Sequence, residues 1–120
     1  MREVKLHVSS TDEFFAGAAK AAARIDAGAS GEEEAVIAFE SMEVLLKTLT
    51  ANRWRLLRTL RVEGPTSIRR LAQSLARDYR AVHADVAALI NIGLIERAET
   101  GEISVPWDRI TAEMAFDLAA

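Results

Sequence analysis

The side chains best suited to contact another molecule lie close together in residues 77–83. Arg77, Tyr79, Arg80 and His83 supply two guanidinium groups, a phenol and an imidazole within a short stretch of the sequence. An arginine can donate two hydrogen bonds to the edge of a guanine, and a tyrosine hydroxyl suits a phosphate oxygen. These side chains have the chemistry of nucleic-acid contact.

Two helices are predicted to position this group, one on each side of Ala76. Each has an apolar stripe with the spacing of a single helix face. Ser67 and Asp78 precede the stripes and are good N-caps, because their side-chain oxygens accept from free N–H groups of the first turn. Gly93 is predicted to end the second helix. The stripes are Ile68, Leu71, Ala72 and Leu75, and Val82, Val86, Leu89 and Ile90.

On the second helix, Arg80 and His83 are expected to point away from the apolar stripe. Ala84 and Ala87 share that outer face and would let the helix approach a groove floor closely. A helix-turn-helix reads base edges mainly through the N-terminal residues of its second helix. We therefore interpret residues 67–93 as a helix-turn-helix; the alternative is an ordinary helical hairpin with a polar surface.

Positive charge is concentrated in the same part of the chain. Residues 50–80 carry eight arginines against Glu63 and Asp78, a net charge of +6. Residues 1–49 have a net charge of −4 and residues 81–120 of −5, so the total of −3 conceals a basic segment. A clustered basic patch is typical of phosphate contact, and arginine favours planar, two-pronged contacts. The alternative is a solvated face with internal ion pairs.

The flanking segments complete a predicted domain. Thr50 is expected to cap a helix before Gly64, with Trp54, Leu56, Leu57, Leu60 and Val62 on its apolar side. Residues 94–97 and 103–105 predict a β-hairpin, the feature that makes a helix-turn-helix winged. Glu99 and Glu102 at its tip would repel phosphate, so Arg97 at its base is the better contact. Trp107 is expected to pack across the hairpin base, and Asp108 to cap a last helix containing Ile110, Met114 and Leu118.

The N-terminal part alternates predicted strands and helices. Residues 3–8 alternate polar and apolar residues as a half-buried strand does, and residues 35–40 predict a second strand that could pair with the first. A helix is expected from Ser10 to about Asp26. Another is expected over residues 41–49, with Val44, Leu45 and Leu46 buried.

Composition excludes several classes of site. The chain has no cysteine, which excludes disulfides and cysteine-based metal sites. It has no apolar run long enough to span a bilayer and no signal-peptide pattern, so we expect a cytoplasmic, nucleoid-associated protein without a membrane partner. No phosphate loop, nucleophile elbow or metal-ligand spacing is present, so we expect no enzyme activity and no cofactor or metal.

The motif Arg-Asp-x-x-x-Val-His-x-Asp-Val-x-x-Leu, residues 77–89, resembles a family of small prokaryotic winged-helix regulators that are MarR-like in architecture. The resemblance covers about residues 34–112 and includes Ser67-Ile68-Arg69, Gly93-Leu94-Ile95 and Pro106-Trp107-Asp108. It implies a transcriptional regulator that binds DNA as a homodimer and represses its own operon, and some members resemble antitoxins. It implies DNA contact by Arg77, Tyr79, Arg80 and His83.

The resulting expectation is an α+β protein, mainly a helical winged helix-turn-helix domain over residues 50–120. Residues 1–49 would form a strand/helix extension for dimerisation or a partner. The predicted function is a sequence-specific DNA-binding transcriptional regulator. The alternatives are an antitoxin that caps a toxin through residues 1–49, and a winged-helix protein–protein module without DNA binding. Arg58 is a further phosphate candidate, and Asp85 is expected to pair with an arginine of a neighbouring helix. The predicted DNA contacts are Arg53, Ser67, Arg69, Arg70, Arg77, Tyr79, Arg80, His83 and Arg97.

Overall fold

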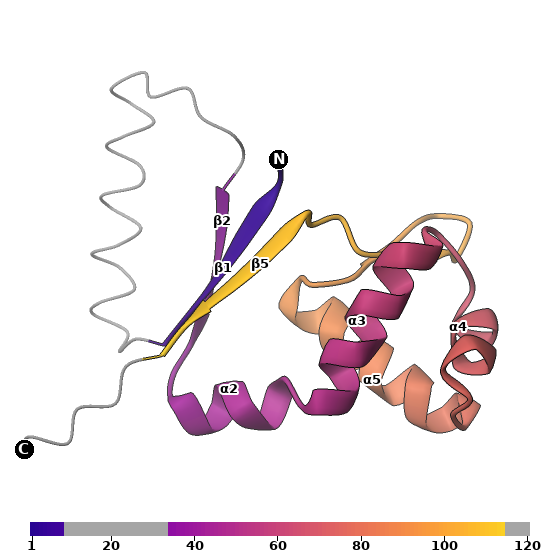
Figure 1. Ribbon diagram of the computed structural model, residues 1–120, viewed down its shortest axis with the longest axis horizontal. Helices are drawn as coiled ribbons and strands as arrows, with labels where there is room; N and C mark the ends of the chain where they lie inside the picture. Colours follow the sequence, from indigo (N-terminus) through magenta and orange to yellow (C-terminus); the bar gives the residue numbers. More distant parts are fainter. Residues whose placement is uncertain (9–33, 115–120) are drawn as a thin grey trace, which may run out of the picture. The chain divides into compact units, whose positions relative to one another are not determined.

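The computed structural model describes residues 1–8 and 34–114 and shows an α+β protein (Figure 1). The described residues form four helices, one three-stranded sheet and one two-stranded sheet. Thr48–Pro106 make one compact unit, and the described residues before Thr48 and after Pro106 make another. No helix of these described parts is both long and apolar enough to cross a membrane.

The unit Thr48–Pro106 contains three helices and a hairpin. The helices are α3 (Ala51–Glu63), α4 (Ile68–Leu75) and α5 (Tyr79–Ile92). The strands β3 (Glu96–Arg97) and β4 (Ile103–Ser104) pair antiparallel after α5, which confirms the predicted hairpin. The predicted apolar stripes meet in one core, whose fully buried side chains include Leu56, Leu60, Leu71, Val82, Val86, Leu89 and Ile103.

Three of the predicted helix N-caps, Thr50, Ser67 and Asp78, are confirmed. The side-chain oxygens of Thr50 and Ser67 accept from the backbone N–H groups three residues on, which begins α3 and α4. Asp78 Oδ2 accepts from the N–H groups of Arg80 and Ala81 at 3.1 and 3.3 Å. Gly93 ends α5 with a φ of 94°, a conformation that glycine adopts without steric cost.

The segment between α3 and α4 also pairs with the hairpin. Thr66 N donates to Ile103 O at 3.1 Å, and Ile103 N donates to Thr66 O at 2.8 Å. Thr66 is buried, so this pair satisfies backbone groups that water cannot reach. Pro65 and Ser67 flank Thr66, and no strand pattern in the sequence predicts the bridge.

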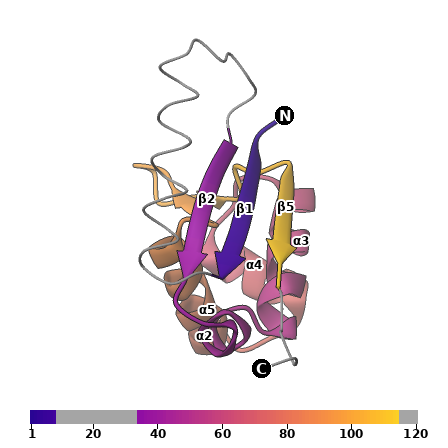
Figure 2. The same ribbon diagram turned by 90° about the vertical axis from the view of Figure 1, so that its left-hand side faces the viewer.

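The second unit contains a small parallel sheet. Its strands are β1 (Glu3–Val8), β2 (Glu34–Phe39) and β5 (Arg109–Glu113), in the order β2-β1-β5. Both pairings of β1 are parallel, and Figure 2 shows the three arrows pointing the same way. Val4 and Leu6 of the central strand are fully buried, as their alternation predicts. The helix α2 (Met42–Thr48) follows β2.

The helix predicted after Asp108 is wrong over the described residues, because residues Arg109–Glu113 form β5. Arg2 O accepts from the N–H groups of Asp108 and Arg109, and Asp108 Oδ2 accepts from Arg2 N at 2.7 Å. Asp108 therefore holds β1 and β5 in register and caps no helix. Leu118 lies outside the described residues.

Trp107 has a partner that the sequence did not predict. The Arg2 guanidinium lies 4.9 Å from the centre of its ring, in a cation–π contact. Both residues belong to the sheet unit. The basic segment and the hairpin lie in a unit that ends at Pro106, whereas the expected domain ran over residues 50–120.

Three apolar side chains that were expected in the core are exposed. On α2 only Leu45 is buried, while Val44 and Leu46 are 42% and 55% exposed. Val62 at the end of α3 is 87% exposed. The helix expected from Ser10 to about Asp26 lies outside the described residues.

Candidate nucleic-acid interface

The predicted contact residues of α5 lie on its exposed side. Tyr79, Arg80 and His83 are exposed, whereas Val82 and Val86 of the same turns are fully buried. This separation follows from the helical period, because residues one or two positions from a buried stripe point elsewhere. The Asp78 cap fixes the first turn of α5, which contains Tyr79 and Arg80.

Tyr79 and His83 contact each other on this face. Their ring centroids are 5.9 Å apart and the ring planes are tilted by 48°. The two residues are four positions apart, which places their side chains one above the other on a helix. Together they present two polar rings on α5, where Arg80 is also exposed.

A groove joins α5 to the hairpin. His83 on α5 and Arg97 on β3 line the same groove, although fourteen positions separate them in the sequence. Both side chains are exposed. The remaining lining is apolar and comes from Ile68, Val86, Ala87 and Ile90.

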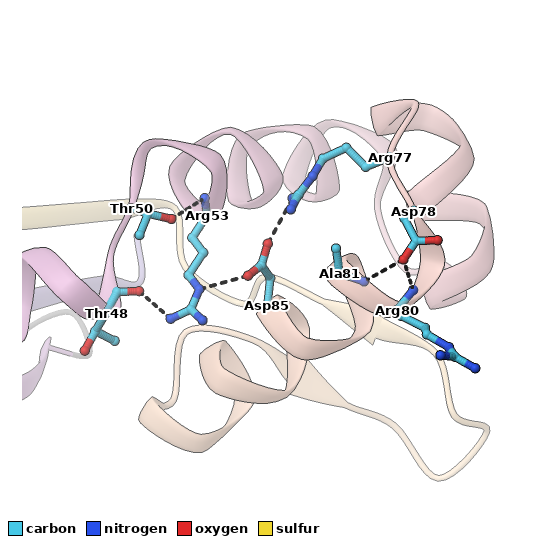
Figure 3. A network of polar contacts seen from close by, with 8 residues as sticks. All are labelled: Thr48, Thr50, Arg53, Arg77, Asp78, Arg80, Ala81 and Asp85. Carbon is cyan, nitrogen blue, oxygen red and sulfur yellow. Dashed lines mark hydrogen bonds and ion pairs between the residues drawn. The ribbon is translucent and has the colours of Figure 1, made fainter.

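Arg53 and Arg77 do not join the exposed group. Arg53 Nε donates to Asp85 Oδ1 at 3.1 Å, and Arg77 Nη1 lies 2.9 Å from Asp85 Oδ2 (Figure 3). The side chains of Arg53, Arg77 and Asp85 are only 21%, 26% and 15% exposed. The predicted partnership of Asp85 with a neighbouring arginine is confirmed, and it involves two arginines.

The basic segment therefore contains two kinds of arginine. Arg53 also donates from Nη1 to Thr48 O at 2.7 Å, and Arg61 Nη1 donates to Val105 O at 3.1 Å. Among the described residues, the other five guanidinium groups make no hydrogen bond or ion pair, and all five residues are exposed. They are Arg55 and Arg58 on α3, Arg69 and Arg70 on α4, and Arg80 on α5.

The first turn of α4 adds to the exposed positive charge. Arg69 and Arg70 follow Ser67, which is itself exposed and whose hydroxyl oxygen is already occupied by the Arg70 N–H group. Free N–H groups and partial positive charge at a helix N-terminus favour phosphate. In the parts of the chain that the structure describes, no three histidine or carboxylate side chains gather closely enough to hold a metal ion.

Residues 48–112 match the HVO_A0114 family, which is more than half of the chain. The chain belongs to the HVO_A0114 family. The HVO_A0114 match contains every one of the predicted contact residues, from Arg53 to Arg97, together with Asp85. Neither the curated proteins nor the solved structures yielded a match to the chain.

Proposed function

We propose that Thr48–Pro106 is a winged helix-turn-helix that binds double-stranded DNA, and that the protein is a sequence-specific transcriptional regulator. The observation that carries the proposal is the exposed face of α5. Arg80, Tyr79 and His83 lie there in the first turns, on a helix held from behind by the buried side chains of Val82, Val86 and Leu89. In a helix-turn-helix these positions contact base edges.

The order of elements supports the winged form of this motif. The helix α3 is followed by Thr66 and then by α4 and α5, which a short turn joins. The hairpin comes next, and its second strand, β4, pairs with Thr66. In this arrangement α5 would occupy the major groove, which admits a helix. Arg97, at the base of the hairpin, would lie beside it and contact the backbone.

Charge supports a DNA partner. Arg58, Arg69, Arg70 and Arg80 have exposed guanidinium groups that no carboxylate of the described residues neutralises. Phosphate contacts of this kind supply most of the non-specific affinity and weaken steeply with salt. The unit can therefore bind DNA although the whole chain has a net charge of −3.

Regulation by such a protein normally requires two copies, because operators with two half-sites match a two-fold symmetric dimer. We propose that residues 1–49 serve dimerisation and that the protein represses its own operon. The exposed acidic residues Glu99 and Glu102 at the hairpin tip favour a second candidate, a winged-helix module that binds a protein. An antitoxin would combine both activities.

Fluorescence anisotropy on a duplex from upstream of the gene, beside a scrambled duplex, tests the proposal. Arg80→Ala is expected to reduce the affinity for the upstream duplex by about 1–3 kcal/mol, the typical contribution of a base contact. The matched control is Arg55→Ala, which removes the same charge from the exposed side of α3. Equal binding of both duplexes by every variant would exclude sequence-specific reading, and no binding would favour the protein partner.

A further inference from the structure

We infer that Asp85 is a positioning residue for the DNA-reading helix and that Arg53 and Arg77 act through it without touching phosphate. We call Arg53, Asp85 and Arg77 the arginine clamp. The inference rests on the proposed DNA binding and deepens it. It divides the basic segment into arginines that orient α5 and arginines that meet the nucleic acid.

In the arginine clamp each carboxylate oxygen of Asp85 lies close to one guanidinium group, Oδ1 in a hydrogen bond and Oδ2 in an ion pair without hydrogen-bond geometry. Oδ1 receives Arg53 Nε and Oδ2 faces Arg77 Nη1, from opposite sides of the carboxylate (Figure 3). All three side chains are largely buried. Partial burial strengthens the attraction between these charges, because water screens it less than on the surface.

The clamp joins three backbone segments. Arg53 lies in the first turn of α3 and also donates to Thr48 O, at the end of α2. Arg77 belongs to the turn between α4 and α5, where its N–H donates to Ala72 O. Asp85 lies near the middle of α5. A displacement of the turn would therefore require separation of Arg77 from Asp85.

The turn between α4 and α5 determines the position of the first turn of α5, which carries the proposed DNA-reading residues. Arg77 directly precedes Asp78, whose carboxylate caps α5 at the N–H groups of Arg80 and Ala81. Figure 3 shows the Arg77 side chain directed toward Asp85 and the Arg80 side chain directed away from it. The ion pair of Arg77 with Asp85 thus restrains the turn that carries the Asp78 cap. The Arg80 guanidinium stays exposed and available to a partner.

The same contacts argue against phosphate binding by Arg53 and Arg77. To reach phosphate, either guanidinium would first have to leave the Asp85 carboxylate, which would lose one of its two partners. Salt dependence distinguishes the two roles, because each phosphate contact contributes about 0.9 to the slope of log affinity against log salt concentration. Substitution of a clamp arginine should therefore lower specificity and leave this slope unchanged.

The experiment compares Arg77→Gln with Arg70→Gln on the upstream and scrambled duplexes at several salt concentrations. Arg77→Gln is expected to lower the ratio of upstream to scrambled affinity about tenfold, as the loss of one base contact would. Its salt slope should equal that of the wild type. Arg70→Gln should weaken binding to both duplexes alike and reduce the slope by about 0.9. Arg77→Lys, which keeps the charge beside Asp85, should restore part of the ratio.

A slope reduced equally by Arg77→Gln and Arg70→Gln would overturn the inference, since Arg77 would then be a phosphate contact. Hydrogen exchange without DNA provides a second, independent readout. Arg77→Gln should speed exchange of the Val82 N–H group, which donates to Asp78 O in the first turn of α5. Unchanged exchange would also overturn the inference. If the wild-type protein binds neither duplex, the proposed function fails, while the exchange measurement still tests the clamp.

Discussion

Arginine side chains have different roles on the two sides of α5. On the inner flank of α5, Asp85 holds Arg53 and Arg77 in ion pairs with only 15% of its own side chain exposed. On the outer face, Arg80 and His83 are exposed, and no carboxylate of the described residues pairs with them. The three arginines all belong to the same basic segment, residues 50–80. The position of one acid decides which arginines serve the fold and which remain available to a partner.

The largest effect on stability is expected from removing that acid. Asp85→Ala would leave two partly buried guanidinium groups without their carboxylate, which should lower the free energy of unfolding by about 2 kcal/mol. His83→Ala on the outer face should change it by less than about 0.5 kcal/mol. Urea denaturation of both variants measures the difference. Equal effects of the two substitutions would contradict the distinction between the two sides.

A smaller effect is expected at the start of α5, where the two sides meet. Asp78→Ala removes the acceptor of the Arg80 and Ala81 N–H groups and should cost about 1 kcal/mol of stability. Asp78→Asn keeps a side-chain oxygen and should cost much less. Thermal unfolding followed by circular dichroism compares the variants. If Asp78→Asn were as destabilising as Asp78→Ala, the carboxylate charge and not the cap would be responsible.

The smallest effect concerns the turn between α4 and α5. Ala76 adopts a left-handed conformation with a φ of 53°, which is unfavourable for a residue with a Cβ atom. Ala76→Gly should therefore raise the free energy of unfolding by about 0.5–1 kcal/mol. Ala81→Gly, on the exposed side of α5, should lower it by about the same amount. A decrease in both variants would show that chain entropy outweighs the backbone strain at Ala76.

Local signals account for most of the helical unit. The helices α3, α4 and α5 follow from apolar stripes, and Thr50, Ser67 and Asp78 act as the caps that their positions predict. Caps and stripes involve residues a few positions apart, so the sequence reveals them directly. The position of Asp85 on the flank of a buried stripe predicted an arginine partner in the same way.

Long-range pairing could not be predicted in this manner. The strand β5 pairs with β1 in the register Glu3 with Arg109, and no local pattern relates these two segments. Asp108 has the composition of a helix cap, yet its carboxylate accepts from Arg2 at the other end of the described chain. Thr66 pairs with Ile103 without a strand of its own.

The candidate site also combines features that local sequence patterns predict with features that depend on long-range packing. The exposure of Tyr79, Arg80 and His83 follows from helical periodicity alone. The pairing of Arg53 with Asp85 depends on how α3 lies beside α5, and the spacing of residues does not contain this information. The sequence therefore predicted the outer face more accurately than the basic segment as a whole.

The most direct test of the central claim is a map of amide chemical-shift changes when the ¹⁵N-labelled protein is titrated with duplex DNA. The account predicts that the changes concentrate in the first turns of α4 and α5, at Arg69, Arg70, Arg80 and His83, and near Arg97. The amides of β1 and β2 should change little. Changes confined to the sheet unit, or none at DNA concentrations that saturate helix-turn-helix proteins, would contradict the account.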